Sequence, residues 1–292
     1  NVDRSSVYVQ AELILTVTLH QAINLDGGEI SSIDILDAVV EPLERRSFQR
    51  RIGSRTWLVT ELPFAIYPEK SGRIQIPTIE YSAREVQPGR SLLGNRLGRR
   101  VKLASDPIEI EVKSAPASFP GKVWLPARSL AIKETWSLEA ESLTVGDSTT
   151  RTLTLVASGL QGSQLPPLSS LQGALNINGL RFYPDQESID QTELSDGLQG
   201  RRVQSEALVA QSAGSWKLPE IKIPWWNTET DQLEYAVVPE KHVAISGAVE
   251  ATSSPMLAEP NTLMTKSSDT LSSSPWTLAF GSAGWTLSVL LA

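Results

Sequence analysis

No cysteine occurs among the 292 residues, and histidine occurs only twice, as His20 and His242. The absence of cysteine excludes disulfides and zinc–thiolate centres, and two histidines leave little material for a histidine metal site or for histidine-based catalysis. The formal net charge of -7 argues against a nucleic-acid-binding protein, which usually carries a basic face. We therefore predict no cofactor, no metal and no nucleic-acid partner.

Sequence motifs of catalysis are missing as well. The chain has no G-x-S-x-G elbow, no P-loop, no G-x-G-x-x-G after a strand and no H-E-x-x-H. His20 ends the strand-like run LTVTLH and His242 opens HVAISG, and the acidic run YPDQESIDQTE (183–193) has the character of a polar loop rather than of a glycosidase carboxylate pair. We predict that the protein is not an enzyme. An envelope hydrolase that uses the two histidines is the enzymatic alternative.

Most of the chain has the period-two alternation of β-strands. In LILTVTL (13–19) the leucines and Val17 fall on one face and the threonines on the other. The run RTWLVTELPFAIY (55–67) predicts two strands broken at Pro63, since proline lacks the N–H of a sheet ladder. Only SSIDILDAVVEPL (31–43) and the stretch around 190–200 have weak helical character. The sequence therefore predicts an all-β fold.

Parts of the sequence are repeated. SGRIQIPTIEY (71–81) and AGSWKLPEIKI (213–223) share a glycine and an apolar–proline pattern at an offset of 142; TVTL (16–19) matches TLTL (152–155) at 136, and Pro107 matches Pro239 at 132. Copies that keep their order over about 110–130 residues indicate a duplicated domain, because solenoid repeats are shorter. We predict tandem immunoglobulin-like β-sandwich domains, residues 1–115 and 121–248, joined by a segment rich in proline and serine.

The end of the sequence changes character. Residues 249–274 are rich in Ser, Thr, Pro and Ala without periodicity, which predicts a disordered, flexible linker. Residues 275–292, PWTLAFGSAGWTLSVLLA, carry no charge, and Trp276 and Trp285 suit a membrane interface. We predict the start of a truncated transmembrane helix in 275–292; a buried C-terminal helix is the alternative.

Four stretches resemble the BatD family of bacterial envelope proteins, also called the aerotolerance or oxygen-tolerance family: YPEKSGRIQIP (67–77), LTVGDSTTRTLTLVASGLQGSQLPPL (143–168), LRFYPDQE (180–187) and AGSWKLPEIKIPWWNTETDQLEYAVVP (213–239). The chain departs from the family pattern at Asn227, where Asp is common, and at Val9-Gln10-Ala11-Glu12, where Val-Gly-Glu is usual. The resemblance implies β-domains on the periplasmic, extracytoplasmic side of the inner membrane. It also implies a complex with a MoxR-type AAA+ ATPase and von Willebrand factor A proteins that serves envelope stress or oxygen tolerance.

The candidate partner-binding residues are Arg96, Arg99, Arg100 and Trp226. The three arginines belong to the basic, glycine-containing segment 82–102, which we predict to be a long hairpin loop rather than a strand. Its function would be contact with acidic lipid or an acidic partner, and a solvated loop without a partner is the alternative. Trp226 follows Trp225, which shares parity with Ile221 and Ile223 and is predicted to be core. We predict a non-catalytic, membrane-anchored scaffold. The alternative is a carbohydrate-binding module that uses exposed aromatic side chains.

Overall fold

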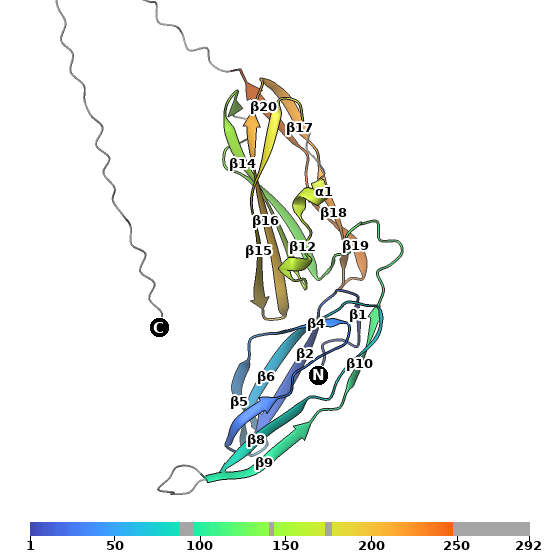
Figure 1. Ribbon diagram of the computed structural model, residues 1–292, viewed down its shortest axis with the longest axis vertical. Helices are drawn as coiled ribbons and strands as arrows, with labels where there is room; N and C mark the ends of the chain where they lie inside the picture. The colour runs from blue at the N-terminus through green and yellow to red at the C-terminus, as the bar shows by residue number, and fades with distance from the viewer. Residues whose placement is uncertain (88–95, 140–142, 173–176, 248–292) are drawn as a thin grey trace, which may run out of the picture. The chain divides into compact units, whose positions relative to one another are not determined.

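Strands dominate the computed structural model, which describes residues 1–87, 96–139, 143–172 and 177–247 (Figure 1). The prediction of an all-β chain is confirmed. Buried and less buried side chains alternate along strands such as β14 (Ser148–Ser158), so that one face of the sheet points into a core.

Three small sheets make up residues 1–115, called the N-terminal half below. One sheet has the order β2-β6-β4 with β5 also paired to β6, the second has the order β1-β10-β7, and the third has the order β3-β8-β9. Their strands are β1 (Ser6–Tyr8), β2 (Leu13–Gln21), β3 (Leu25–Ile30), β4 (Ala38–Pro42), β5 (Arg46–Ile52), β6 (Arg55–Pro68), β7 (Gly72–Ile76), β8 (Glu80–Gln87), β9 (Arg96–Ala104) and β10 (Ile108–Lys113).

Three further sheets make up residues 121–247, called the C-terminal half below. A four-stranded sheet has the order β12-β14-β16-β15, and two three-stranded sheets have the orders β11-β18-β19 and β13-β20-β17. The remaining elements are β11 (Pro126–Ala127), β12 (Ser129–Trp136), β13 (Leu143–Thr144), η1 (Gly162–Gln164), α1 (Leu168–Gln172), β15 (Leu180–Leu194), β16 (Gly197–Ala210), β17 (Gly214–Leu218), β18 (Ile221–Asn227), β19 (Gln232–Val238) and β20 (Lys241–Ser246).

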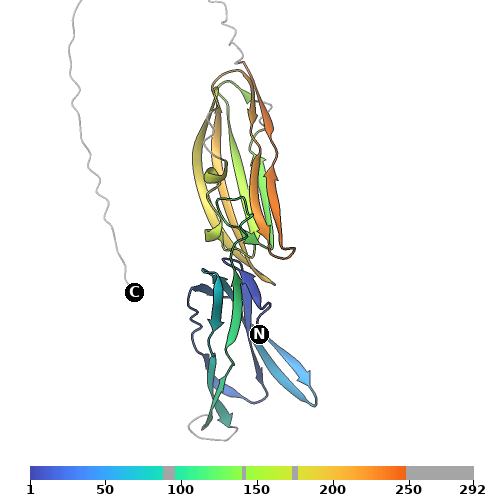
Figure 2. The same cartoon turned by 90° about the vertical axis from the view of Figure 1, so that its right-hand side faces the viewer.

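In each half the sheets lie in layers (Figure 2), with apolar side chains packed between them. In the N-terminal half the core joins β2 and β6 to β7 and β10, with Leu13, Ile66, Ile76 and Ile110 at most 1% exposed. In the C-terminal half one core lies between β14 and β18–β19, and a second lies between β16 and β20. Trp225 is buried in the first of these, as predicted.

Strand pairing repeats between the halves in a fixed register. Leu13 of β2 faces Ile66 of β6, and Thr149 of β14 faces Leu208 of β16, which corresponds to the offsets of 136 and 142 seen in the sequence. The parallel pair β1–β10 and the antiparallel pair β10–β7 recur as β13–β20 and β20–β17. The last strands of the two halves, β10 and β20, match at an offset of 133, since Val112 and Ile245 face the equivalent residues Gly72 and Gly214. The predicted match of Pro107 with Pro239, at an offset of 132, is therefore wrong by one residue.

Two hairpins repeat in the same way. The β5–β6 hairpin, where Ile52 faces Arg55, corresponds to the end of the β15–β16 hairpin, where Leu194 faces Gly197. The β8–β9 hairpin corresponds to the β18–β19 hairpin, so the facing pair Arg84–Arg100 occupies the place of Trp226–Leu233. The repeat in the sequence is thus a repeat of topology.

The segment 82–102 is a hairpin, as expected, but the expectation that it contains no strand is wrong. Strands β8 and β9 pair across most of this segment, and only residues 88–95 between them lie outside the described part of the chain. Ala83 is buried opposite Val101, so the hairpin has an inward face. The many arginines and glycines of the segment obscure the apolar alternation that would indicate this face in the sequence.

The expected break at Pro63 is also absent, because β6 runs unbroken from Arg55 to Pro68. One neighbour of β6 changes at this point: β4 ends at Pro42, opposite Phe64, and β5 begins at Arg46, opposite Glu61. Pro63 lies in the gap between them, where its carbonyl accepts a hydrogen bond from the Leu43 N–H. A missing N–H is tolerated where no ladder partner stands opposite.

The weak helical character predicted for 31–43 and 190–200 does not appear, because strands β4, β15 and β16 occupy these stretches. Among the described residues, helix occurs instead in η1 and α1, within the run QGSQLPPLSSLQ (161–172). This run brings Leu165 and Leu168 into the core of the C-terminal half.

Both halves belong to one compact unit, Asn1–Val249. The predicted linker, residues 249–274, and the predicted transmembrane segment, residues 275–292, lie outside the described residues. Within the described part of the chain no helix is long and apolar enough to cross a membrane.

Candidate functional site

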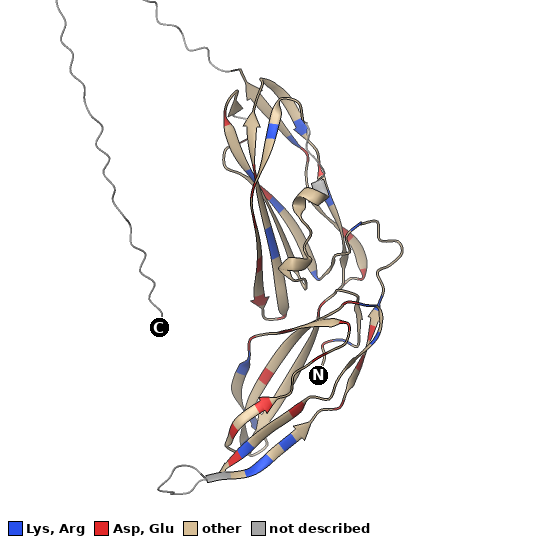
Figure 3. Cartoon of the chain, viewed as in Figure 1, with Lys and Arg blue, Asp and Glu red and all other residues tan. Residues whose placement is uncertain are grey.

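The predicted contact arginines lie on β9. Arg99 and Arg100 are exposed, and neither forms an ion pair within the described residues. Arg96 begins β9, where it faces Gln87 of β8. Arg84 and Lys102 are also exposed on the same hairpin, where basic residues outnumber the acidic Glu80 and Glu85 (Figure 3).

A second basic hairpin, β5–β6, was missed by the sequence analysis. The run RRSFQRRIGSR (45–55) carries five arginines, all exposed: Arg45, Arg46, Arg50, Arg51 and Arg55. All seven residues of β5 are exposed, including Phe48 and Ile52, each 43% exposed. The density of arginine in eleven residues was the signal that could have identified this surface.

The two halves use their basic side chains differently. Of the ten lysines and arginines in residues 121–247, six form ion pairs: Arg128, Arg151, Arg201, Arg202, Lys217 and Lys241. Of the thirteen whose side chains are described in residues 1–115, only three do so: Arg4, Lys70 and Arg73. Most of the unpaired cations of the N-terminal half lie on its two arginine-rich hairpins.

Trp226, the fourth candidate, belongs to an aromatic cluster where the halves meet. Its ring is 6.0 Å from that of Tyr8 and 6.2 Å from that of Trp124. The indole N–H of Trp226 donates to Asp231 at 3.0 Å, and the Tyr8 hydroxyl donates to the same carboxylate at 2.7 Å. Burial, followed by the bond to Asp231, raises the pKa of Tyr8 to about 12, while the Tyr8 hydroxyl lowers the pKa of Asp231. Trp226 therefore contacts the other half of its own chain.

Glu12 is the buried centre of the same junction and is 4% exposed. Its carboxylate accepts hydrogen bonds from the Arg128 guanidinium, from the Tyr67 hydroxyl at 2.9 Å and from the Leu198 N–H at 2.7 Å. Leu198 packs with Ala65 and Tyr67 in a small apolar cluster that spans the halves. Burial raises the pKa of Glu12, although these three donors favour its ionised form.

A polar rim surrounds this buried centre. The Glu44 N–H donates to both carboxylate oxygens of Glu193, at 2.7 and 2.8 Å. Glu41 accepts from the amides of Gln161 and Gln191. The tip of the β15–β16 hairpin therefore docks on the N-terminal half through side chains and backbone together.

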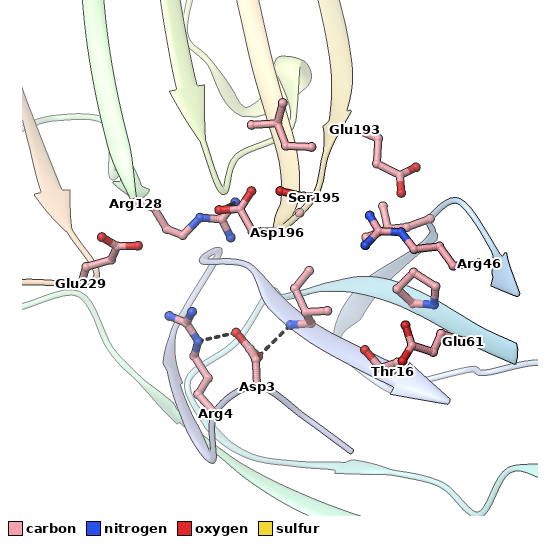
Figure 4. A pocket seen from close by; sticks show the side chains of 15 residues that line it. Asp3, Arg4, Thr16, Arg46, Glu61, Arg128, Glu193, Ser195, Asp196 and Glu229 are labelled. Carbon is pink, nitrogen blue, oxygen red and sulfur yellow. Dashed lines mark hydrogen bonds and ion pairs between the residues drawn. The ribbon is translucent and has the colours of Figure 1, made fainter. Parts of the chain in front are cut away.

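A pocket of about 340 Å³ lies beside the junction (Figure 4). Its lining mixes both signs of charge, with Arg4, Arg46 and Arg128 against five carboxylates, Asp3, Glu61, Glu193, Asp196 and Glu229. Asp3 is engaged by Arg4 and by the Ile14 N–H. One terminal nitrogen of Arg128 is buried without a hydrogen bond and is 3.7 Å from Asp196. Because both signs of charge line the pocket, the lining favours neither an anionic nor a cationic ligand.

The remaining candidates are placed in structural contacts. His20 and His242 are exposed, and the His20 ring lies 6.5 Å from that of Trp57. In the acidic run 183–193, Glu187 pairs with Arg202, and Asp190 pairs with Arg201. The described residues contain no group of three or more His, Cys, Asp or Glu side chains that could hold a metal ion.

Comparison with known proteins gives little. No family model matches the chain, and no curated protein matches it. Among solved structures, the C-terminal domain of the AgI/II polypeptide BspA of Streptococcus agalactiae is matched at 7% identity, over 83% of this chain and 95% of that domain, with a TM-score of 0.17; a second structure of the BspA C-terminal region is matched equally. A TM-score this low carries no argument about function.

Proposed function

We propose that the chain is a non-catalytic, membrane-anchored scaffold that presents two immunoglobulin-like β-sandwich domains to partner proteins outside the cytoplasm. The domains are residues 1–115 and 121–248. The resemblance to the BatD family supports partners of the von Willebrand factor A type and a MoxR-type AAA+ ATPase, in envelope stress or oxygen tolerance, at the inner membrane.

The observation that carries the proposal is the use of buried charge. Glu12 and Arg128 are buried side chains that hold the two halves together, and Arg151 is buried between Glu134 and Glu206 within one half. Buried ionisable groups at an active site are usually poised for proton transfer or substrate contact. In this chain the buried ionisable groups connect strands and halves to each other, while the exposed cations lie on hairpins. This arrangement suits a protein that binds partners through its surface.

The carbohydrate-binding alternative lacks support at Trp226. A sugar platform requires exposed, roughly coplanar rings. Trp226 is half-buried, tilted by 37° from Trp124 and edge-on to Tyr8. These contacts occupy the ring inside the junction.

Crosslinking in intact cells tests the scaffold. We expect the full chain to crosslink to envelope proteins of the von Willebrand factor A type, identified by mass spectrometry. Reversal of Arg96, Arg99 and Arg100 to glutamate should reduce their recovery, because Arg99 and Arg100 are exposed on β9, an edge strand that Arg96 begins. Recovery of no envelope protein with the unmodified chain would contradict the proposal, and unchanged recovery with the variant would remove β9 from it.

A further inference from the structure

The β15–β16 and β18–β19 hairpins of the C-terminal half both end at the junction. Leu198 and Glu193 at the tip of β15–β16 contact Glu12 and Glu44, and Trp226 and Asp231 at the end of β18–β19 contact Tyr8. This end of the C-terminal half is therefore a docking surface.

The equivalent end of the N-terminal half is formed by the β5–β6 and β8–β9 hairpins. Strand register places Arg55 where Gly197 meets Glu12, and places Arg84 and Arg100 where Trp226 and Leu233 stand. Figure 2 shows the β5–β6 hairpin extending away from the rest of its sheet. The two halves thus share the register of these hairpins, and within the described part of the chain only the hairpin tips of the C-terminal half contact the other half.

The exposed side chains of the β5–β6 and β8–β9 hairpins define the chemistry of what fits there. Away from the junction pocket, which Arg46 lines, eight exposed cations lie on the two hairpins, seven of them arginine: Arg45, Arg50, Arg51, Arg55, Arg84, Arg99, Arg100 and Lys102. None forms an ion pair with another described residue. Arginine binds carboxylates through a planar fork, and it is enriched at protein interfaces while lysine is depleted.

We infer that the arginine-rich β5–β6 hairpin is a docking surface for an acidic protein segment. This inference rests on the proposed scaffold function and specifies the chemistry of one partner. Phe48 and Ile52 supply exposed apolar contact between the arginines of β5. Strands β5 and β9 each pair on one side only, so each leaves backbone N–H and C=O groups open to a peptide. The open backbone and the predominance of arginine favour a protein over a lipid surface.

A second copy of this chain does not offer the required carboxylates at the corresponding receiving face. The carboxylate Glu12 of the N-terminal half corresponds to Ser148 in the C-terminal half, and Tyr67 corresponds to Val209, by the register of β2–β6 and β14–β16. The face of a second copy that is equivalent to the receiving face of the junction is therefore no match, and the inferred partner is a different acidic protein.

The test measures binding of the full chain to a fluorescein-labelled dodecapeptide that alternates glutamate with valine, by fluorescence anisotropy. We expect saturable binding that weakens as salt is raised, because exposed charge pairs are screened. Arg50→Glu, Arg51→Glu and Arg55→Glu together should weaken binding about tenfold or more. The matched control, Lys122→Glu, Lys133→Glu and Arg181→Glu, makes the same change in net charge at exposed positions of the C-terminal half and should leave binding within about twofold.

Further arms separate the other occupants. Phe48→Ser should weaken binding about threefold while leaving the charge unchanged. The inference is overturned if the peptide does not bind, if both triple variants lose affinity equally, or if the chain binds only vesicles of phosphatidylcholine with 30% phosphatidylglycerol. If peptide binding fails while the cellular crosslinks through β9 persist, this inference falls and the scaffold function stands.

Discussion

The β5–β6 and β15–β16 hairpins share a register and differ in almost everything else. In the C-terminal half, the hairpin places Gly197 against Glu12 and Leu198 against Tyr67. In the N-terminal half, the same positions carry exposed residues, and β5 buries none of its side chains. The comparison teaches that the backbone repeat fixes where a hairpin tip lies, whereas a few side chains decide whether the tip is an internal joint or a free surface.

Loss of the Glu12 carboxylate should give the largest difference in stability between matched positions of the two halves. Glu12→Ala leaves the Arg128 guanidinium buried without its carboxylate, and removes the acceptor of the Leu198 N–H and the Tyr67 hydroxyl. We expect a loss of about 3–5 kcal/mol in the free energy of unfolding, measured with urea. Ser148→Ala, at the corresponding exposed position of β14, should change it by less than about 0.5 kcal/mol. Equal effects would mean that the junction adds no stability.

The cores of the two halves differ at a matched pair. Arg151 faces Glu206 in the C-terminal half, where Leu15 faces Phe64 in the N-terminal half. Arg151→Leu alone should cost about 3 kcal/mol, because it leaves the carboxylates of Glu206 and Glu134 largely buried and without their cation.

Adding Glu206→Phe and Glu134→Val to Arg151→Leu should recover most of that loss, since an apolar replacement of a whole buried ionic group is often neutral. Urea unfolding of the single and triple variants measures the recovery. A triple variant less stable than Arg151→Leu would show that the apolar solution does not transfer between the halves.

Gly197 should be less tolerant than Gly53. A Cβ at Gly197 would lie 2.2 Å from the Glu12 carboxylate, and its φ of +137° is unfavourable for other residues. Gly197→Ala should therefore cost about 2 kcal/mol. Gly53 at the tip of the β5–β6 hairpin has a φ of +63° and nothing within 4 Å of a Cβ, so Gly53→Asn should cost only a few tenths of a kcal/mol. Thermal unfolding of the two variants compares them.

The last expected effect is a pH dependence of stability that arises at the junction. Burial raises the pKa of Glu12, so the folded chain holds the proton of Glu12 to a higher pH than the unfolded chain does. The resulting stability is complete below the usual glutamate pKa of about 4.3 and is lost as pH rises through the raised value, by no more than about 1.4 kcal/mol per pH unit. Urea unfolding from pH 4 to pH 8 should show this slope, and Glu12→Gln should remove it. An unchanged slope in the variant would assign it to other groups.

Much of the fold could be predicted from apolar alternation. Leu13 and Leu15 alternate with polar residues, and the glycine–proline phrases mark where β7 and β17 end, so the all-β class and the order of the repeat were visible. The strands of the β8–β9 hairpin were missed because Ala83, the one buried side chain among those described in it, is small and lies among arginines. A break in β6 was predicted wrongly at Pro63. Pro63 is tolerated because it lies opposite the gap between β4 and β5, and the position of that gap depends on the neighbouring strands rather than on the sequence of β6.

The junction could not be predicted from the sequence. Glu12 lies in an ordinary apolar run, and its partners Arg128 and Leu198 are 116 and 186 residues away. Trp226 was singled out for its ring, but no local pattern indicates that Tyr8 and Trp124 cover it. The arginines of β5 were readable as a charge run, whereas their exposure and lack of ion pairs depend on the three-dimensional arrangement.

The sequence distance between Glu12 and its partners has a consequence for synthesis on the ribosome. Domains generally fold as they emerge, beginning at the amino end. The carboxylate of Glu12 leaves the exit tunnel long before the cation at Arg128 and the amide of Leu198, and it must stay hydrated until both have been translated. The nascent N-terminal half therefore passes through a period in which the face that later contacts the C-terminal half is exposed to water, and a chaperone or an incorrect partner has access to it during that time.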